Sequence, residues 1–130
     1  MQLAEIQKQI DDWIGLFEEG YFPPLSNLAR LMEEVGELSR AMNHQFGGKK
    51  RKEGEGEGDI ADELGDILFT VAVLANSLEI DLSSVMTATL EKVIHRDSTR
   101  WTIKEGVEVE DALSLAPQNR AKQAGMSERD

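Results

Sequence analysis

The sequence predicts an all-α protein, a four-helix bundle with a poorly ordered C-terminal tail, and three observations support this fold class. Apolar residues recur at spacings of three and four along most of the chain, which is typical of amphipathic helices. The aromatic fraction is only 5%, and the apolar residues are mostly Leu, Ile, Val, Met and Ala. A length of 130 residues is enough for one domain with a modest core.

A turn separates the first two predicted helices. Gly20 and the pair Pro23-Pro24 end the first helix, because proline cannot continue a helix. Residues 3–17 lie before this turn and residues 25–46 follow it, and both segments carry apolar side chains at every third or fourth position. We therefore expect two amphipathic helices that face a common core.

A low-complexity segment follows the second predicted helix. Residues 47–58 read GGKKRKEGEGEG, which predicts a mobile loop. The third predicted helix starts at residue 59 or 60 and ends around 79, and its second half is apolar on nearly every side. Such a helix is buried against several neighbours. Since one chain supplies only three other helices, we expect a homodimer or a dimer of dimers to complete the bundle.

The fourth predicted helix begins after Ile80 and runs to about Trp101. The four helices together make one domain over residues 1–101. Residues 102–130 contain Gly, Pro, Gln, Asn and many charges, so we expect a flexible tail with at most one short helix.

The composition excludes several classes of protein. The formal net charge is −11 and cysteine is absent, which rules out disulfides, thiolate nucleophiles and zinc–sulfur sites. A strongly acidic surface repels nucleic acid and anionic membranes, and no apolar run is long enough to cross a bilayer. No secretory signal is visible. We expect a cytoplasmic protein that binds neither nucleic acid nor membrane.

Two carboxylate clusters at helical spacing flank the predicted loop. The first cluster reads Glu33-Glu34-Val-Gly-Glu37 and the second reads Asp62-Glu63-Leu-Gly-Asp66. Each places two acids three residues apart, on the same side of a helix. Two such helices packed face to face bring four carboxylates together, which is tolerable where a cation neutralises them. Hard oxygen ligands suit Mg²⁺, with Mn²⁺ as a substitute; the alternative is that these acids decorate solvated helix faces.

The helical wheel orders the acids of the first cluster. At about 100° per residue, Glu34 falls at the edge of the apolar stripe, Glu37 somewhat further round and Glu33 nearly opposite. We therefore expect Glu34 and Glu37 to turn partly inward and Glu33 to be the most exposed.

Basic side chains form two candidate phosphate sites. Lys92, Arg96 and Arg100 lie four residues apart on the fourth predicted helix. They either clamp phosphate oxygens or form a solvated edge that pairs with the excess acids. Lys49 and Lys50 open the densest basic run of the chain, which either attracts phosphates or is simply a solvated loop.

Four further side chains are candidates for reading a base or sugar. Asn76 lies in the apolar part of the third predicted helix, where it needs hydrogen-bond partners. It either contacts a substrate or pairs across a helix interface. Trp13, Phe17 and Tyr21 either line a base pocket or, as the spacing of the first two favours, belong to the core.

The two carboxylate clusters also carry a resemblance to a known family. The strings EEVGELSRA (Glu33 to Ala41) and DELGDILF (Asp62 to Phe69) resemble the signature of the MazG family of all-α nucleotide pyrophosphohydrolases, which is EExxE, a variable gap and ExxD. The resemblance covers roughly residues 6–101. Over this range the chain is similar to the small, single-domain, YpjD-like branch of that family.

The resemblance implies roles for individual residues. It implies that Glu34, Glu37, Glu63 and Asp66 hold Mg²⁺ and that Glu33 helps to orient water. Glu33 and Glu34 are both candidates for the base that accepts the proton of this water. The resemblance also covers Lys92 and Arg96, which would hold the phosphates of the substrate.

The implied activity is Mg²⁺-dependent hydrolysis of a nucleoside triphosphate at the α–β bond, which yields a monophosphate and pyrophosphate, as in sanitation of the nucleotide pool. One alternative is a phosphoribosyl-ATP pyrophosphohydrolase, because that enzyme shares the paired-acid pattern. The other is a non-catalytic helical oligomer that binds nucleotide or metal. The base of the substrate is not specified by the sequence.

Overall fold

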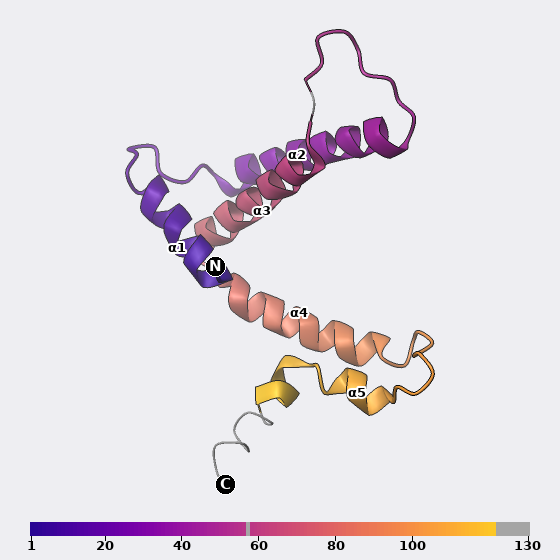
Figure 1. The fold of residues 1–130 in the computed structure, drawn as a ribbon. Coiled ribbons are helices and arrows are strands. Elements are labelled where there is room, and N and C mark those ends of the chain that lie inside the picture. Colours follow the sequence, from indigo (N-terminus) through magenta and orange to yellow (C-terminus); the bar gives the residue numbers. More distant parts are fainter. Residues whose placement is uncertain (57, 122–130) are drawn as a thin grey trace. The chain divides into compact units, whose positions relative to one another are not determined.

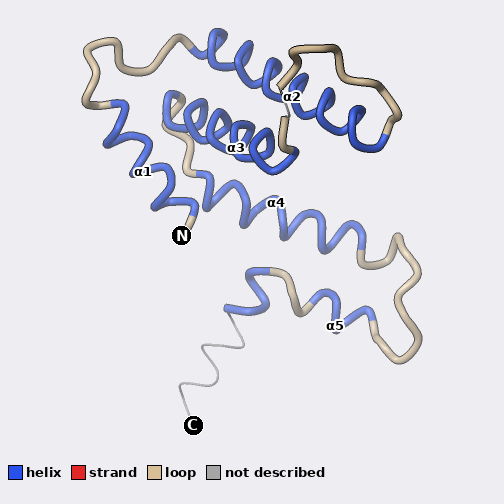
Figure 2. The backbone as a smooth tube through the Cα atoms, turned by 45° about the horizontal axis from the view of Figure 1, so that its top comes forward, coloured by secondary structure: helices blue, strands red, loops and turns tan. Residues whose placement is uncertain are grey.

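The computed structural model describes residues 1–56 and 58–121, and every regular element within these ranges is a helix (Figures 1 and 2). The helices are α1 (Leu3–Ile14), α2 (Pro24–Phe46), α3 (Ile60–Ser77), α4 (Leu82–Asp97) and α5 (Val109–Leu113). The predicted all-α class is therefore confirmed. The chain divides into two compact units, Met1–Leu82 and Ser83–Asp130. The predicted helical domain over residues 1–101 stays a prediction.

Local chemistry explains where the helices begin and end. Pro24 opens α2 at a position where its missing N–H costs nothing. Asp59 caps α3, since its side chain accepts a hydrogen bond from the Ala61 N–H at 2.9 Å. Helix α1 stops three residues earlier than predicted, because the Phe17 N–H bonds to the Ile14 carbonyl in a tight turn at 3.0 Å.

The first unit is built on α3, against which α1 and α2 both pack. Helices α2 and α3 lie side by side in Figures 1 and 2. The apolar core joins α1 to the C-terminal half of α3 and consists of Ile10, Ile14, Ala72 and Val73. This arrangement places the N-terminal half of α3 and its carboxylates beside the middle of α2.

Asn76 ties α1 to the end of α3 through three hydrogen bonds. Its Nδ2 donates to the Gln7 carbonyl at 2.8 Å and to the Tyr21 hydroxyl at 3.0 Å. Its Oδ1 accepts from Gln7 Nε2, also at 2.8 Å. These bonds satisfy the whole amide within the first unit. Of the two predicted roles for Asn76, the described contacts favour pairing across a helix interface.

The second unit contains most of α4 together with α5. Ala116 is fully buried, and the Gln118 N–H donates to Glu91 Oε2 at 3.3 Å. The predicted short helix in the tail is present as α5, which begins with a capping box between Glu108 and Asp111. The predicted flexible tail also includes residues 122–130, which lie outside the described residues.

The apolar surface of α2 and α3 is only partly covered within one chain. Large side chains on these helices stay exposed, among them Leu68 at 68%, Phe46 at 69% and Met32 at 62%. The predicted burial of α3 on nearly every side is thus not achieved by the first unit alone. Among the described residues, no single helix is long and apolar enough to cross a membrane, and α3 and α4 reach that length together only across a break.

Candidate active site

Three carboxylates from α2 and α3 meet where the two helices lie side by side. One oxygen from each of Glu34, Glu63 and Asp66 lies within 4.8 Å of the others. Glu63 and Asp66 come from successive turns of α3, and Glu34 projects from α2. Glu34 and Glu63 are half-buried, whereas Asp66 is exposed. Three of the four predicted metal ligands are thus brought together, and we call these three residues the acid cluster.

The acid cluster has the donor chemistry of a divalent-cation site. The pKa of Glu63 is raised above its usual range, first by partial burial and then by repulsion from Glu37, Asp66 and Glu34, while Arg40 opposes the rise. A raised carboxyl pKa means that the surroundings disfavour the negative form, and a nearby positive charge would offset this. Clustered carboxylate oxygens are the ligands that Mg²⁺ and Mn²⁺ prefer, so the donor set fits the predicted metal.

Glu37, the fourth predicted ligand, does not join the acid cluster in this structure. It is exposed, where the helical wheel expected it to turn partly inward. Its carboxylate pairs with the guanidinium of Arg40, one turn further along α2. Glu37 still lies near enough to raise the pKa of Glu63.

Glu33 lies on the exposed face of α2, as the helical wheel predicted, and Glu34 is half-buried as expected. Asp62, next to Glu63, is exposed. Neither Glu33 nor Asp62 belongs to the group of close carboxylates. The role of Glu33 in orienting water stays a prediction.

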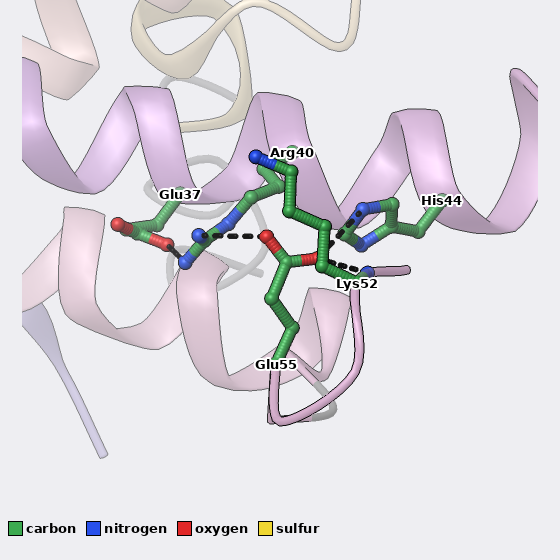
Figure 3. A network of polar contacts seen from close by, with 5 residues as sticks. All are labelled: Glu37, Arg40, His44, Lys52 and Glu55. Atoms are coloured by element: carbon green, nitrogen blue, oxygen red, sulfur yellow. Dashed lines mark hydrogen bonds and ion pairs between the residues drawn. The ribbon is translucent and has the colours of Figure 1, made fainter. Parts of the chain in front are cut away.

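A network of charged side chains beside the acid cluster was missed by the sequence analysis (Figure 3). Arg40 Nη1 lies 3.9 Å from Glu55 Oε1, and His44 Nε2 lies 3.7 Å from Glu55 Oε2. The Lys52 N–H donates to the same Glu55 carboxylate at 2.9 Å. The spacing of Glu37, Arg40 and His44 on one face of α2 was a readable signal, but their partner lies in a low-complexity loop whose path the sequence does not specify.

The network and the acid cluster share one small cavity of about 20 Å³. Its walls include Glu63 of the acid cluster and the Glu37, Arg40, His44 and Glu55 side chains of the network. Gly58 closes the wall next to the acids, because a Cβ at this position would lie 3.1 Å from Glu63 Oε1. The loop before α3 therefore approaches the carboxylates closely, and a glycine at residue 58 permits it.

An apolar pocket of about 520 Å³ lies among the aromatic residues of α1, of the turn after it and of α3. Its aromatic wall includes Trp13, whose ring meets Phe17 edge-on at a centroid distance of 5.2 Å and Phe69 at 6.3 Å. Trp13 is 53% exposed and Phe17 is 50% exposed, so neither is a core residue. Tyr21 also lines the pocket. Of the two predicted roles for these aromatic residues, the structure favours a pocket lining.

The apolar pocket adjoins the acids on both helices. Arg30 lies one turn before Glu34 on α2, and Phe69 follows Asp66 by three residues on α3. One helical turn advances about 5.4 Å. A ligand whose charged end lies at the acid cluster can therefore place a flat ring in the apolar pocket.

The predicted phosphate-binding residues of α4 belong to the second unit. Lys92 is exposed. Arg96 makes a two-pronged ion pair with Asp97, at 2.7 and 2.9 Å, and Arg100 lies 3.8 Å from the same carboxylate. These contacts match the predicted alternative of a basic edge that pairs with acids. Whether any of the three also binds phosphate stays a prediction.

Lys49 and Lys50 lie in the loop between α2 and α3. Both side chains are exposed, and the Lys49 N–H donates to the Asn43 carbonyl at 3.3 Å, which continues the end of α2. Neither residue lines the cavity next to the acid cluster, so a role in attracting phosphates stays a prediction.

The sequence matches one family model and is similar to two proteins of Bacillus subtilis. The model of the MazG nucleotide pyrophosphohydrolase domain matches residues 22–101. YpjD from Bacillus subtilis is 46% identical over 103 residues, which cover 79% of this chain and 93% of YpjD. YvdC from the same organism is 30% identical over 102 residues, which cover 74% of this chain and 96% of YvdC.

Two crystal structures have the same fold as this chain. The structure of Bacillus subtilis YpjD superposes with a TM-score of 0.61 at 43% identity, and covers 74% of this chain and 94% of its own. The structure of a MazG protein conserved in Bacillus, described as a nucleotide pyrophosphohydrolase, superposes with a TM-score of 0.62 at 37% identity. This match covers 82% of the present chain and 97% of the other.

Proposed function

The chain belongs to the MazG nucleotide pyrophosphohydrolase family, and from this premise we propose that it hydrolyses a nucleoside triphosphate between the α and β phosphorus atoms. The products are a nucleoside monophosphate and pyrophosphate. The acid cluster of Glu34, Glu63 and Asp66 is the observation that carries this proposal, because its oxygens lie within 4.8 Å of one another and suit a divalent cation. The predicted fold class, the all-α pyrophosphatase type, agrees with both solved neighbours.

The acid cluster would hold Mg²⁺, with Mn²⁺ as a substitute and Glu37 as a further ligand after release from Arg40. When bound there, Mg²⁺ would supply charge neutralisation at phosphate oxygens and a lower pKa for an attacking water. The proton of that water passes to a carboxylate, either Glu33 or Glu34. Glu34 is half-buried at the cluster, whereas Glu33 lies on the exposed face, so Glu34 is the better placed of the two.

The apolar pocket would take the base of the nucleotide. Trp13 and Phe17 offer exposed aromatic faces, and such faces bind flat rings by stacking. Lys92 and Arg96 would hold phosphate oxygens, as the family resemblance implies. The preferred base and the cellular role, such as sanitation of the nucleotide pool, are parts of the same proposal.

The proposed enzyme works as a homodimer or a dimer of dimers. The exposed apolar side chains of α2 and α3 form the surface that a second copy would cover, because contiguous apolar surface on a small protein usually marks an interface. A cytoplasmic location stays a prediction.

One assay tests the chemistry and names the substrate. Purified protein is incubated with natural and damaged nucleoside triphosphates and with phosphoribosyl-ATP, with Mg²⁺ or with chelator, and pyrophosphate is detected separately from orthophosphate. We expect Mg²⁺-dependent pyrophosphate from a few of these compounds. A folded protein that releases none from any of them would overturn the proposal in favour of a binding protein.

A matched pair of variants tests the acid cluster itself. Glu63→Gln removes a cluster carboxylate, whereas Asp62→Asn removes the adjacent exposed carboxylate. We expect Glu63→Gln to lose about 100-fold or more in turnover, the scale of a lost electrostatic contact to the reacting groups, while its helical spectrum persists. Asp62→Asn should keep most of the activity. Equal activity of the two variants would refute the assignment.

A further inference from the structure

The Glu55 carboxylate occupies a position that is built to hold an anion. Three groups converge on it, namely the Arg40 guanidinium, the His44 imidazole and the Lys52 backbone N–H. Figure 3 shows Arg40 and His44 on successive turns of α2, with Glu55 pointing toward both from the loop. These groups lower the pKa of Glu55, with the Lys52 N–H as the largest cause. The position therefore stabilises negative charge although it borders the acid cluster.

Glu55 fills this position incompletely. Its hydrogen bond from Lys52, at 2.9 Å, comes from its own loop. The distances to Arg40 and His44, 3.9 and 3.7 Å, are longer than those of hydrogen bonds. A carboxylate offers two oxygens, whereas a terminal phosphate offers three strong acceptors. A phosphate can therefore come within bonding distance of both side chains where the carboxylate does not.

The His44 ring supplies independent evidence for a missing ligand. Its side chain is only 5% exposed, and within the described part of the chain its Nε2 has no hydrogen-bond partner. Leaving a buried polar atom unpaired costs about 1–3 kcal/mol, so such atoms are rare unless a ligand or water satisfies them. This Nε2 faces the Glu55 carboxylate and hence the anion position.

Arg40 places the anion position next to the acid cluster. Its Nη2 pairs with Glu37 while its Nη1 faces Glu55, and the same small cavity reaches from Glu63 to His44. A phosphate chain that begins at the acid cluster therefore meets Arg40 next. The planar guanidinium suits this position, because its parallel N–H groups match two phosphate oxygens.

We propose that Arg40 and His44 form the subsite for the terminal phosphates of the substrate and for released pyrophosphate, and that the Glu55 carboxylate is an internal anion that these phosphates displace. The proposal rests on the proposed function for the identity of the ligand. It adds binding residues that lie in the same unit as the acid cluster, unlike Lys92 and Arg96.

The test uses Mg²⁺-pyrophosphate as the probe and the full chain, and its first readout needs no turnover. The chain has two histidines, His44 and His95, so the imidazole ¹⁵N signals are simple to assign. Titration with Mg²⁺-pyrophosphate should shift the Nε2 signal of His44, and titration with MgCl₂ at the same ionic strength serves as the reference. A His44 signal that stays unchanged at saturating pyrophosphate would overturn the proposal.

A matched pair of loop variants provides the second readout. Glu55→Gln removes the competing charge, while Glu53→Gln removes the same charge from the same loop at an exposed residue. Pyrophosphate should bind Glu55→Gln about two- to fivefold more tightly than Glu53→Gln, the range that a partly exposed competing ion pair allows. Adding His44→Ala to Glu55→Gln should weaken binding about tenfold, as expected for a lost hydrogen bond to a charged group. Equal affinity of the two loop variants would refute the role of Glu55.

The outcomes separate this inference from the proposed function. If the His44 signal shifts with pyrophosphate but the protein hydrolyses no nucleotide, the anion subsite is supported and the proposed enzyme activity is refuted. Nucleotide hydrolysis by a protein whose His44 signal does not shift with pyrophosphate would support the proposed activity and refute the subsite.

Discussion

Replacing Asn76 by alanine should destabilise the protein without changing its choice of substrate. The three hydrogen bonds of the Asn76 amide, at 2.8, 2.8 and 3.0 Å, join α3 to α1 and to the turn that follows α1. Each such bond is worth about 1 kcal/mol. The site is only part-buried, so water replaces some of the lost bonds, and we expect a net loss of about 2 kcal/mol.

Urea unfolding followed by far-ultraviolet circular dichroism measures this loss, at one fixed protein concentration because assembly would change the apparent stability. Ser77→Ala is the matched control on α3, since the Ser77 hydroxyl donates to the Leu74 carbonyl of its own helix. A double-mutant cycle with Gln7→Ala should give a coupling energy above about 0.5 kcal/mol. The reasoning fails if Asn76→Ala matches Ser77→Ala in stability but raises the KM for the nucleotide.

Three further outcomes follow from the site and the exposed surface. Without divalent cation, the raised pKa of Glu63 contributes stability that is present below the usual carboxyl range and is lost as pH rises through the raised pKa. Melting temperatures should therefore fall more for the wild type than for Glu63→Gln between pH 4 and 7, and parallel curves would contradict this. Leu68→Glu changes a side chain that is 68% exposed, so it should leave the helical spectrum intact but yield smaller species than the wild type in sedimentation velocity. A wild type that is itself monomeric at micromolar concentration would refute the predicted assembly. Trp13→Ala should raise KM about tenfold, the scale of a lost stacking contact, with kcat nearly unchanged in steady-state kinetics; a change in kcat alone would argue against a base pocket.

Helix positions were readable from the sequence because each depends on local chemistry. The pair Pro23-Pro24 and the end of the Gly-rich loop at residue 59 indicate the starts of α2 and α3 within one residue of their positions in the structure. The ends were less predictable, since α1 stops at Ile14 and α4 at Asp97, both before their apolar patterns end. A helix end depends on which turn its last carbonyls can join, and apolar spacing carries little information about that.

Part of the acid cluster could also be predicted from the sequence, because it depends on residues that are close together along one helix. Glu63 and Asp66 lie three residues apart on a helix, so helical geometry alone places them on one side. Their approach to Glu34 followed from the expectation that two such helices pack face to face. The pairing of Glu37 with Arg40 was not foreseen, because a helical wheel gives the direction of a side chain and not its choice between a cation and other acids.

The sequence by itself determined the helices, the pair of carboxylate motifs and the family to which the chain belongs, because these depend on residues close together along the chain. Only the tertiary structure decided that Glu55 of the loop reaches Arg40 and His44 of α2. It also decided that the Asn76 amide pairs with Gln7 of α1. The physical reason is that contacts between distant segments depend on how loops close and how helices pack, and neither leaves a periodic signal in the sequence.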